Sequence, residues 1–172
     1  MKYFEKLLNL VFFLLDKIYK NGYIKLYPKY LHWLGININP DKCEGTWISP
    51  TVFFDSSKYD YLTIGEQVTI SFDVAVLVHD YSIVHAARSI GRKVNSIIYK
   101  PVCIGNNVFI GARSLIMPGT TIPDNCIIGG ETVVKGKLEP NSIYVGNPCR
   151  KIGTTDEFAS RYDSLLVNYY EG

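Results

Sequence analysis

Residues 98–138 read IYKPVC IGNNVF IGARSL IMPGTT IPDNCI IGGETV VKGKL, and this stretch decides the fold. A β-branched apolar residue opens each block of six, and a second, more mixed column follows four places later. The first column is Ile98, Ile104, Ile110, Ile116, Ile122, Ile128 and Val134. A period of six fits neither an α-helix nor an ordinary strand. It is typical of a hexapeptide-repeat parallel β-helix, in which each hexad forms one face of a triangular coil.

The hexads also predict which residues lie above one another in the stack. At 18 residues per coil, we expect three rows with a rise of about 4.8 Å per coil: Ile98 with Ile116 and Val134, Ile104 with Ile122, and Ile110 with Ile128. A glycine follows several inward residues, where the backbone turns a corner. We therefore expect positive φ angles, which glycine adopts freely, at Gly105, Gly111 and Gly129.

The bulk composition indicates one globular domain and excludes few functions. The chain has 172 residues, 47% of them hydrophobic, and a net charge of +2, which is too small to suggest nucleic-acid binding. The four cysteines show no metal-ligand spacing such as C-x-x-C, and Cys126 occupies an inward column. We interpret them as reduced thiols of a cytoplasmic protein.

Residues 1–35 are predicted to form a helical segment with a turn near Asn21-Gly22 and a stop at Gly35. The stretch from Leu7 to Leu15 is nearly continuous apolar sequence, too short to span a bilayer. We favour a helix packed on the end of the β-helix or on a neighbouring subunit. The alternative is an interfacial membrane helix at the inner membrane face, with Phe4, Leu8, Val11, Phe12 and Leu15 toward lipid.

The β-helix itself is predicted over residues 36–153, with one interruption. Hexads begin at Ile64, Ile70 and Val76, but the 22 residues from Val76 to Ile98 are not a multiple of six. Residues 81–97 are therefore expected to form an excursion loop, and long insertions of this kind are usually functional or disordered. A C-terminal helix is expected over 154–172, opened by a capping box at Thr154-Thr155-Asp156-Glu157.

Three segments resemble the hexapeptide-repeat acetyltransferases, and in particular their polysaccharide O-acetyltransferase branch. They are the His-Asp-Tyr-Ser motif at 79–82 before the loop, the hexads from 104 to 112, and the Gly-Asn-Pro element at 146–148. The resemblance implies a left-handed β-helix and a homotrimer. It also implies acetyl-CoA as co-substrate, bound between adjacent subunits, and a single histidine as general base.

His79 is the candidate base, because the repeat places it on a corner with its ring facing outward. An imidazole, with an ordinary pKa near 6.5, suits proton removal from a hydroxyl at neutral pH. On family grounds Asp80 is the candidate to orient His79, although it could instead only start the loop or leave that task to a backbone carbonyl. Tyr81 and His85 are candidate contacts to the acceptor.

The cofactor is expected to contact two groups of residues. Backbone N–H groups at Gly111 and Ala112 are candidate donors to the acetyl oxygen or the pantetheine amides. Cations suit the phosphates of CoA, and the basic residues of the last coils are Lys135, Lys137, Arg150 and Lys151. No metal is expected, because a zinc site on this fold needs three histidines and the break in the repeat separates His79 from His85.

The sequence thus predicts an acetyl-CoA-dependent O-acetyltransferase that modifies a sugar hydroxyl of a surface polysaccharide or its precursor. Two alternatives remain open at this stage. One is N-acetylation of an amino sugar or small amine by the same fold and base. The other is a β-helix scaffold without catalytic activity, since repeat folds can outlive their activity.

Overall fold

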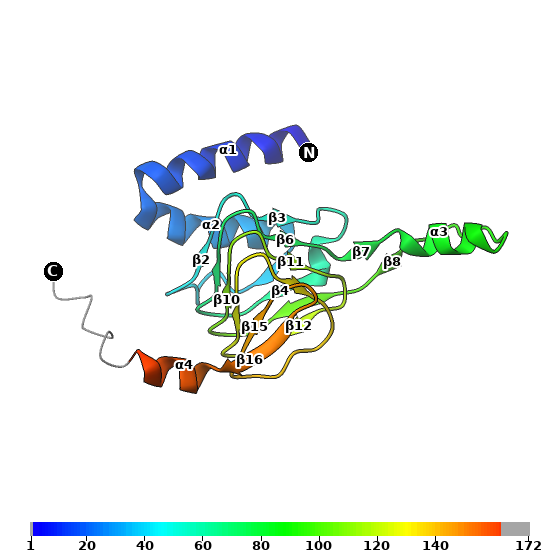
Figure 1. Ribbon diagram of the computed structural model, residues 1–172. Coiled ribbons are helices and arrows are strands. Elements are labelled where there is room, and N and C mark those ends of the chain that lie inside the picture. The colour runs from blue at the N-terminus through cyan, green and yellow to red at the C-terminus, as the bar shows by residue number, and fades with distance from the viewer. Residues whose placement is uncertain (1, 163–172) are drawn as a thin grey trace.

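Three parallel sheets form the faces of a β-helix in the computed structural model, which describes residues 2–162 (Figure 1). Face A consists of β1 (Asn37–Ile38), β4 (Leu62–Ile64), β9 (Val102–Ile104) and β12 (Thr121–Ile122). Face B consists of β2 (Trp47–Ile48), β5 (Thr69–Ile70), β10 (Phe109–Ile110), β13 (Ile127–Ile128), β15 (Ser142–Val145) and the antiparallel β16 (Arg150–Thr154). Face C consists of β3 (Phe53–Phe54), β6 (Ala75–Val76), β11 (Leu115–Ile116) and β14 (Val133–Val134).

The inward columns predicted from the hexads form the core. Ile104 pairs with Ile122, Ile110 with Ile128, and Ile116 with Val134, each one coil of 18 residues apart. These six side chains are at most 2% exposed. The second column is buried as well, and its polar members lie at the C-terminal coils, where Ser114, Thr120 and Thr132 bond to backbone carbonyls.

The structure corrects the predicted place of Ile98. Ile116 pairs with Val76 on its other side, so Val76 fills the position that Ile98 was expected to occupy. Ile98 belongs instead to β8 (Ile98–Tyr99), which pairs antiparallel with β7 (His79–Asp80) outside the coils. The repeat therefore resumes only with β9, where Ile104 lies beside Ile64.

The predicted excursion is an arm that leaves and rejoins the stack at the same corner. It contains β7, α3 (Ser82–Ser89) and β8, and Figure 1 shows it projecting away from the coils. A hydrogen bond of 2.9 Å from the Lys100 amide to the Val78 carbonyl closes its base. The segment thus includes a helix, although the sequence predicted only a loop.

The corner glycines are needed for a reason other than the one predicted. Positive φ occurs two residues after them, at Asn107, Arg113 and Glu131, and not at Gly105, Gly111 or Gly129. A Cβ at Gly111 would lie 2.5 Å from the backbone nitrogen of Gly130 in the next coil. Close approach between successive coils, and not a left-handed backbone, therefore excludes a side chain there.

A helical hairpin covers the N-terminal end of the stack. At the N-terminal end, α1 (Lys2–Ile18) packs on α2 (Lys20–Leu34), and α2 packs on the first coil, beside the short 3-10 turn η1 (Tyr59–Tyr61). The chain turns at Tyr19, slightly earlier than predicted, and Gly35 ends α2 with a φ of 105° as expected. Tyr23 in α2 donates a hydrogen bond to the carbonyl of Ile48 in that coil.

At the other end, α4 (Thr155–Arg161) follows β16 (Figure 1). The predicted capping box is present: the Thr154 hydroxyl accepts from the Glu157 amide, and the Glu157 carboxylate accepts from the Thr154 amide. The remainder of the helix predicted to reach about Tyr170 lies outside the described residues.

Candidate active site

His79 stands at the corner where face C turns toward face A, which we call the C–A corner. Because His79 lies three residues after the inward Val76, the equivalent positions in the other coils follow Phe54, Ile116 and Val134. The resulting column along the corner is Ser57, His79, Gly119 and Lys137. The arm begins at His79, so the repeat places this side chain at the junction between coil and arm.

A buried carboxylate holds the His79 ring. The Asp55 side chain is 4% exposed and its Oδ2 accepts from Nδ1 of His79, whose own side chain is 28% exposed. The same carboxylate accepts from the amide of Ser57 at 3.0 Å and from the amide of Val78 at 3.1 Å. Three donors thus fix Asp55 in place, and Asp55 fixes the orientation of the imidazole.

The environment keeps Asp55 ionised at neutral pH. Burial favours the neutral acid, but the hydrogen bonds from Ser57, from the Val78 amide and from His79 together outweigh it and lower the pKa of this carboxyl below its ordinary value. A charged Asp55 accepts the Nδ1 proton of His79. The other ring nitrogen, Nε2, is then left with its lone pair free to accept a proton.

The geometry does not support Asp80 as the group that orients His79. The Asp80 carboxylate accepts from the Ser82 amide at 2.7 Å, at the first turn of α3. This bond is the main cause of a lowered pKa for Asp80, with a smaller contribution from Lys135. Asp80 therefore starts the helix of the arm, which is the lesser role that the sequence left open for it.

Sequence reasoning missed Asp55 because it lies in the first, poorly repeating coil. Ile48, Val52 and Phe54 nevertheless keep the spacing of the inward columns, and Phe54 pairs with Val76. Asp55 thus follows its inward residue just as Leu77 follows Val76. That short hexad was the signal that would have placed Asp55 beside the coil of His79.

Aromatic side chains surround the exposed side of His79. Tyr81 meets the imidazole edge to face at 5.3 Å between ring centroids, and Tyr99 on the returning strand lies at 6.2 Å. The ammonium of Lys58 lies over the rings of both Tyr61 and Tyr99, at 4.9 and 5.4 Å. A pocket on the arm runs from Tyr81 and Val84 to Tyr99 along residues 94–97. His85 lies farther out, on the exposed part of α3.

The structure separates the predicted cofactor residues into three places. Lys135 and Lys137 lie on the C–A corner two coils after His79, since both follow Val134. Lys151 lies on β16 at the end of face B, where its ammonium pairs with Glu139 at 2.6 Å, and Arg150 is its neighbour on that strand. The predicted cluster of four cations is therefore split between two parts of the molecule.

Gly111 and Ala112 occupy a different corner from His79, between β10 on face B and β11 on face C. The Gly111 amide already donates to the Ile128 carbonyl at 2.8 Å. It therefore does not have the free N–H group that an oxyanion donor needs. Ala112 lies at the same corner, so it could serve His79 only from a neighbouring subunit.

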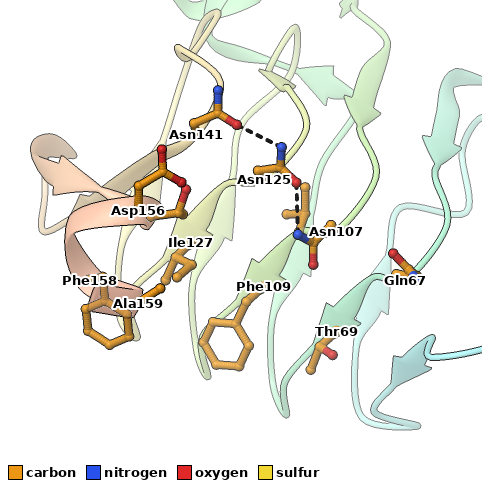
Figure 2. Close-up of a pocket in the computed structure, with 12 residues that line it drawn as sticks. Gln67, Thr69, Asn107, Phe109, Asn125, Ile127, Asn141, Asp156, Phe158 and Ala159 are labelled. Carbon is orange, nitrogen blue, oxygen red and sulfur yellow. Dashed lines mark hydrogen bonds between the residues drawn. The ribbon is translucent and has the colours of Figure 1, made fainter. Parts of the chain in front are cut away.

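A second pocket lies between face B and α4, on the side opposite the C–A corner (Figure 2). An amide ladder runs along its edge: Asn107 donates to Asn125 at 2.9 Å, and Asn125 donates to Asn141 at 2.7 Å. Phe109 and Phe158 line the same space. The ladder bonds successive coils to one another, and we assign it to the stability of the stack.

No group of three or more His, Cys, Asp and Glu side chains suited to a metal ion occurs in the described part of the chain, residues 2–162. Within the same residues, no helix is long and apolar enough to cross a membrane.

Comparison with known proteins places this chain in a class of transferases. Residues 101–136 match the family model "Bacterial transferase hexapeptide (six repeats)". The chain is 31% identical to the galactoside O-acetyltransferase of Escherichia coli K12, over 69% of this chain and 66% of that protein's length. Among solved structures it resembles a galactoside acetyltransferase in complex with coenzyme A (26% identity, TM-score 0.53, 84% and 87% coverage). It also resembles a maltose O-acetyltransferase from Clostridium difficile 630 (25% identity, TM-score 0.51, 81% and 90% coverage).

These findings define a transferase built from hexapeptide repeats, and their structural likeness implies the left-handed coil that the sequence predicted. The chain belongs to the hexapeptide-repeat acetyltransferases.

Proposed function

We propose that this chain is an acetyl-CoA-dependent O-acetyltransferase that acts on a sugar hydroxyl of a surface polysaccharide or its precursor. The observation that carries the proposal is the His79–Asp55 pair at the base of the arm. The galactoside and maltose O-acetyltransferases that resemble the chain support transfer to a sugar oxygen, and the CoA complex of the former supports the co-substrate.

In the proposed mechanism His79 acts as general base. Nε2 takes the proton of the acceptor hydroxyl as its oxygen attacks the thioester carbonyl of acetyl-CoA. The resulting imidazolium is stabilised by Asp55, whose negative charge lies on the Nδ1 side of the ring. When the tetrahedral intermediate collapses, the C–S bond breaks and His79 returns its proton to the departing thiolate. The products are the acetyl ester and free CoA, and no covalent enzyme intermediate is needed.

The surroundings of His79 suggest where each substrate binds. Tyr81 and Tyr99 offer apolar ring surfaces against which a sugar ring can pack, beside Nε2. Lys135 and Lys137 lie along the same corner in the last coil and suit the phosphates of CoA. We therefore place the sugar on the arm side of His79 and CoA along the C–A corner.

We further propose a homotrimer with active sites between subunits. Within one chain the Gly111–Ala112 corner is a different corner from that of His79. A neighbouring subunit could bring its own Ala112 amide to the acetyl oxygen and complete the site. The four cysteines are free thiols in the structure, and we propose a cytoplasmic location, where thiols stay reduced.

The test is release of CoA thiol from acetyl-CoA with a panel of neutral and amino sugars, using wild type and His79→Ala. Loss of a general base lowers the rate by about 10²–10⁴-fold, so we expect turnover with a sugar hydroxyl and at least a hundredfold loss in the variant. Preference for amino sugars would show N-acetylation instead. No release with any sugar, together with no CoA binding by calorimetry, would indicate a scaffold.

A further inference from the structure

The first helix carries two apolar faces, and the fold uses only one of them. Leu8, Phe12 and Leu15 pack toward α2 and the core. Only the alternative drawn from the sequence turned these three residues toward lipid; in the structure they face inward, which agrees with the favoured prediction of a helix packed on the end of the β-helix. On the other side of α1 a second stripe is 47–82% exposed: Leu7, Leu10, Val11, Leu14 and Ile18. Their spacing of three and four residues makes one continuous helical face.

The position of this stripe leaves it uncovered by the other described residues, 2–162. Figure 1 shows α1 as the outermost layer at the N-terminal end of the stack, outside α2 and on the opposite end from α4. The helix contacts α2 as its main partner. Soluble proteins rarely leave a contiguous apolar surface of this kind free unless it binds something.

The charge of the hairpin points to the partner. By sequence, residues 1–34 contain six lysines and two acidic residues, a net charge of +4. The remaining 138 residues contain twelve basic and fourteen acidic residues, a net charge of −2. Among residues 2–162, the lysines at 17, 20, 25 and 29 are exposed and none pairs with a carboxylate. Lys17 lies on α1 and Lys20 at the turn into α2, so these two charges adjoin the apolar stripe, whereas Lys25 and Lys29 line a pocket with Asp41 and Glu44 of the first coil.

We propose that the α1–α2 hairpin binds the surface of an anionic lipid bilayer, with Leu10, Leu14 and Ile18 entering the headgroup region and Lys17 and Lys20 contacting lipid phosphates. An amphipathic helix with a basic flank binds membranes in this way, by apolar burial together with attraction to anionic lipid. A protein partner would match the stripe equally well, but Lys17 and Lys20 adjoin it without a carboxylate partner, and the net charge of +4 on residues 1–34 favours an anionic surface.

Binding in this orientation would also turn the N-terminal end of the stack toward the bilayer, with α1 and α2 between the lipid and the first coil. The hairpin packs on the first coil, and His79 lies in the second, about 4.8 Å farther along the axis. If the proposed function is right, on which this step rests, the enzyme is positioned for an acceptor attached to lipid.

The test is sedimentation with vesicles of phosphatidylcholine alone and of phosphatidylcholine with 30% phosphatidylglycerol (roughly physiological anionic charge), using the full chain. We expect at least about tenfold tighter binding to the anionic vesicles, weakened by salt, and about tenfold loss in the double variant Leu10→Gln, Leu14→Gln. Glutamine preserves helix propensity. The matched control is Ile90→Gln on the arm, where a 66% exposed isoleucine should be replaced without effect on binding.

Circular dichroism and light scattering on each variant check that fold and oligomeric state are unchanged. Equal binding by wild type and the double variant, or no binding to anionic vesicles, would overturn the proposal. If the double variant instead dissociates the oligomer while wild type ignores vesicles, the stripe is a contact between copies of the chain and the proposal is wrong. The experiment measures vesicle binding and not turnover. Its result therefore stands whether or not the chain has the proposed O-acetyltransferase activity.

Discussion

Replacing Asp55 by asparagine should slow acetyl transfer without preventing substrate binding. The buried carboxylate accepts from His79 and from two backbone amides. An asparagine can keep its oxygen toward His79 and Val78, but its NH₂ group then faces the Ser57 amide and the negative charge is lost. A hydrogen bond to a charged group is worth about 1.5–3 kcal/mol. Since about 1.4 kcal/mol corresponds to a factor of ten in rate, kcat should fall roughly 10- to 150-fold.

The assay is thiol release from acetyl-CoA at saturating acceptor, with CoA affinity measured separately by calorimetry. Asp55 lies buried beneath His79, with a side chain only 4% exposed, and does not reach the proposed path of CoA, so CoA affinity should stay within about twofold of wild type, a difference of less than half a kcal/mol. The comparison variant is Asp80→Asn, which can keep an oxygen toward the Ser82 amide, loses only the negative charge and should cost less activity. A kcat for Asp55→Asn within threefold of wild type, or a larger loss in Asp80→Asn, would refute the assignment of Asp55.

Three further predictions concern stability and thiol chemistry. Gly111→Ala should lower the free energy of unfolding, measured by urea titration, by about 1–3 kcal/mol, or roughly 2–12 °C in melting temperature, because its Cβ meets rigid backbone of the next coil. The control is Gly153→Ala, whose Cβ would only touch a flexible glutamate oxygen. Its free energy of unfolding should stay within about 0.5 kcal/mol of wild type in the same titration. Cys126 is fully buried, and burial raises the pKa of its thiol. Mass spectrometry after iodoacetamide treatment should therefore find Cys126 alkylated only when the protein is unfolded in urea. Labelling of Cys126 equal to that of Cys103 in the native protein would contradict this prediction. The lowered pKa of Asp55 means that its ionised form stabilises the fold above the ordinary carboxyl pKa of about 3.9, and that this contribution is lost as the pH falls through the lower pKa of the folded state. The difference in stability between wild type and Asp55→Asn should therefore shrink in melting curves recorded from pH 7 to pH 2.5. A constant difference would show that Asp55 does not titrate as described.

The sequence predicted the coils well because the physical cause is local and periodic. An inward position tolerates only an apolar or small side chain, so every turn of the stack repeats the same demand on residues such as Ile110 and Ile128. The same periodicity misled at Ile98, because an isoleucine six residues before Ile104 satisfies the pattern whether or not the chain has rejoined the stack. The pairing of Ile116 with Val76 shows that Val76, and not Ile98, fills the inward position below Ile116. These two residues are 40 positions apart, and a single sequence does not reveal a pairing over that distance.

The site was less predictable for a related reason. His79 could be found because it interrupts a regular repeat, but its partner Asp55 lies 24 residues earlier and reaches it only because one coil stacks on another. Asp80 adjoins His79 in sequence, yet its carboxylate turns to the amide of Ser82. Contacts along the axis of the β-helix join residues of different coils. Insertions change the number of residues between such partners, so the spacing in the sequence does not reveal which residues meet.

The arm leaves the stack after Val78 and returns at Lys100, where one backbone hydrogen bond joins the two ends. The coils on either side pair as though nothing intervened, with Ile64 beside Ile104 and Ile70 beside Ile110. The scaffold therefore imposes no constraint on the length of what lies between, and doubling a closed loop costs only about 0.6 kcal/mol. If His79 is the base, as proposed, then residues 81–97 of the arm could be exchanged for a segment that binds a different acceptor, while His79, Asp55 and the stack beneath them are kept.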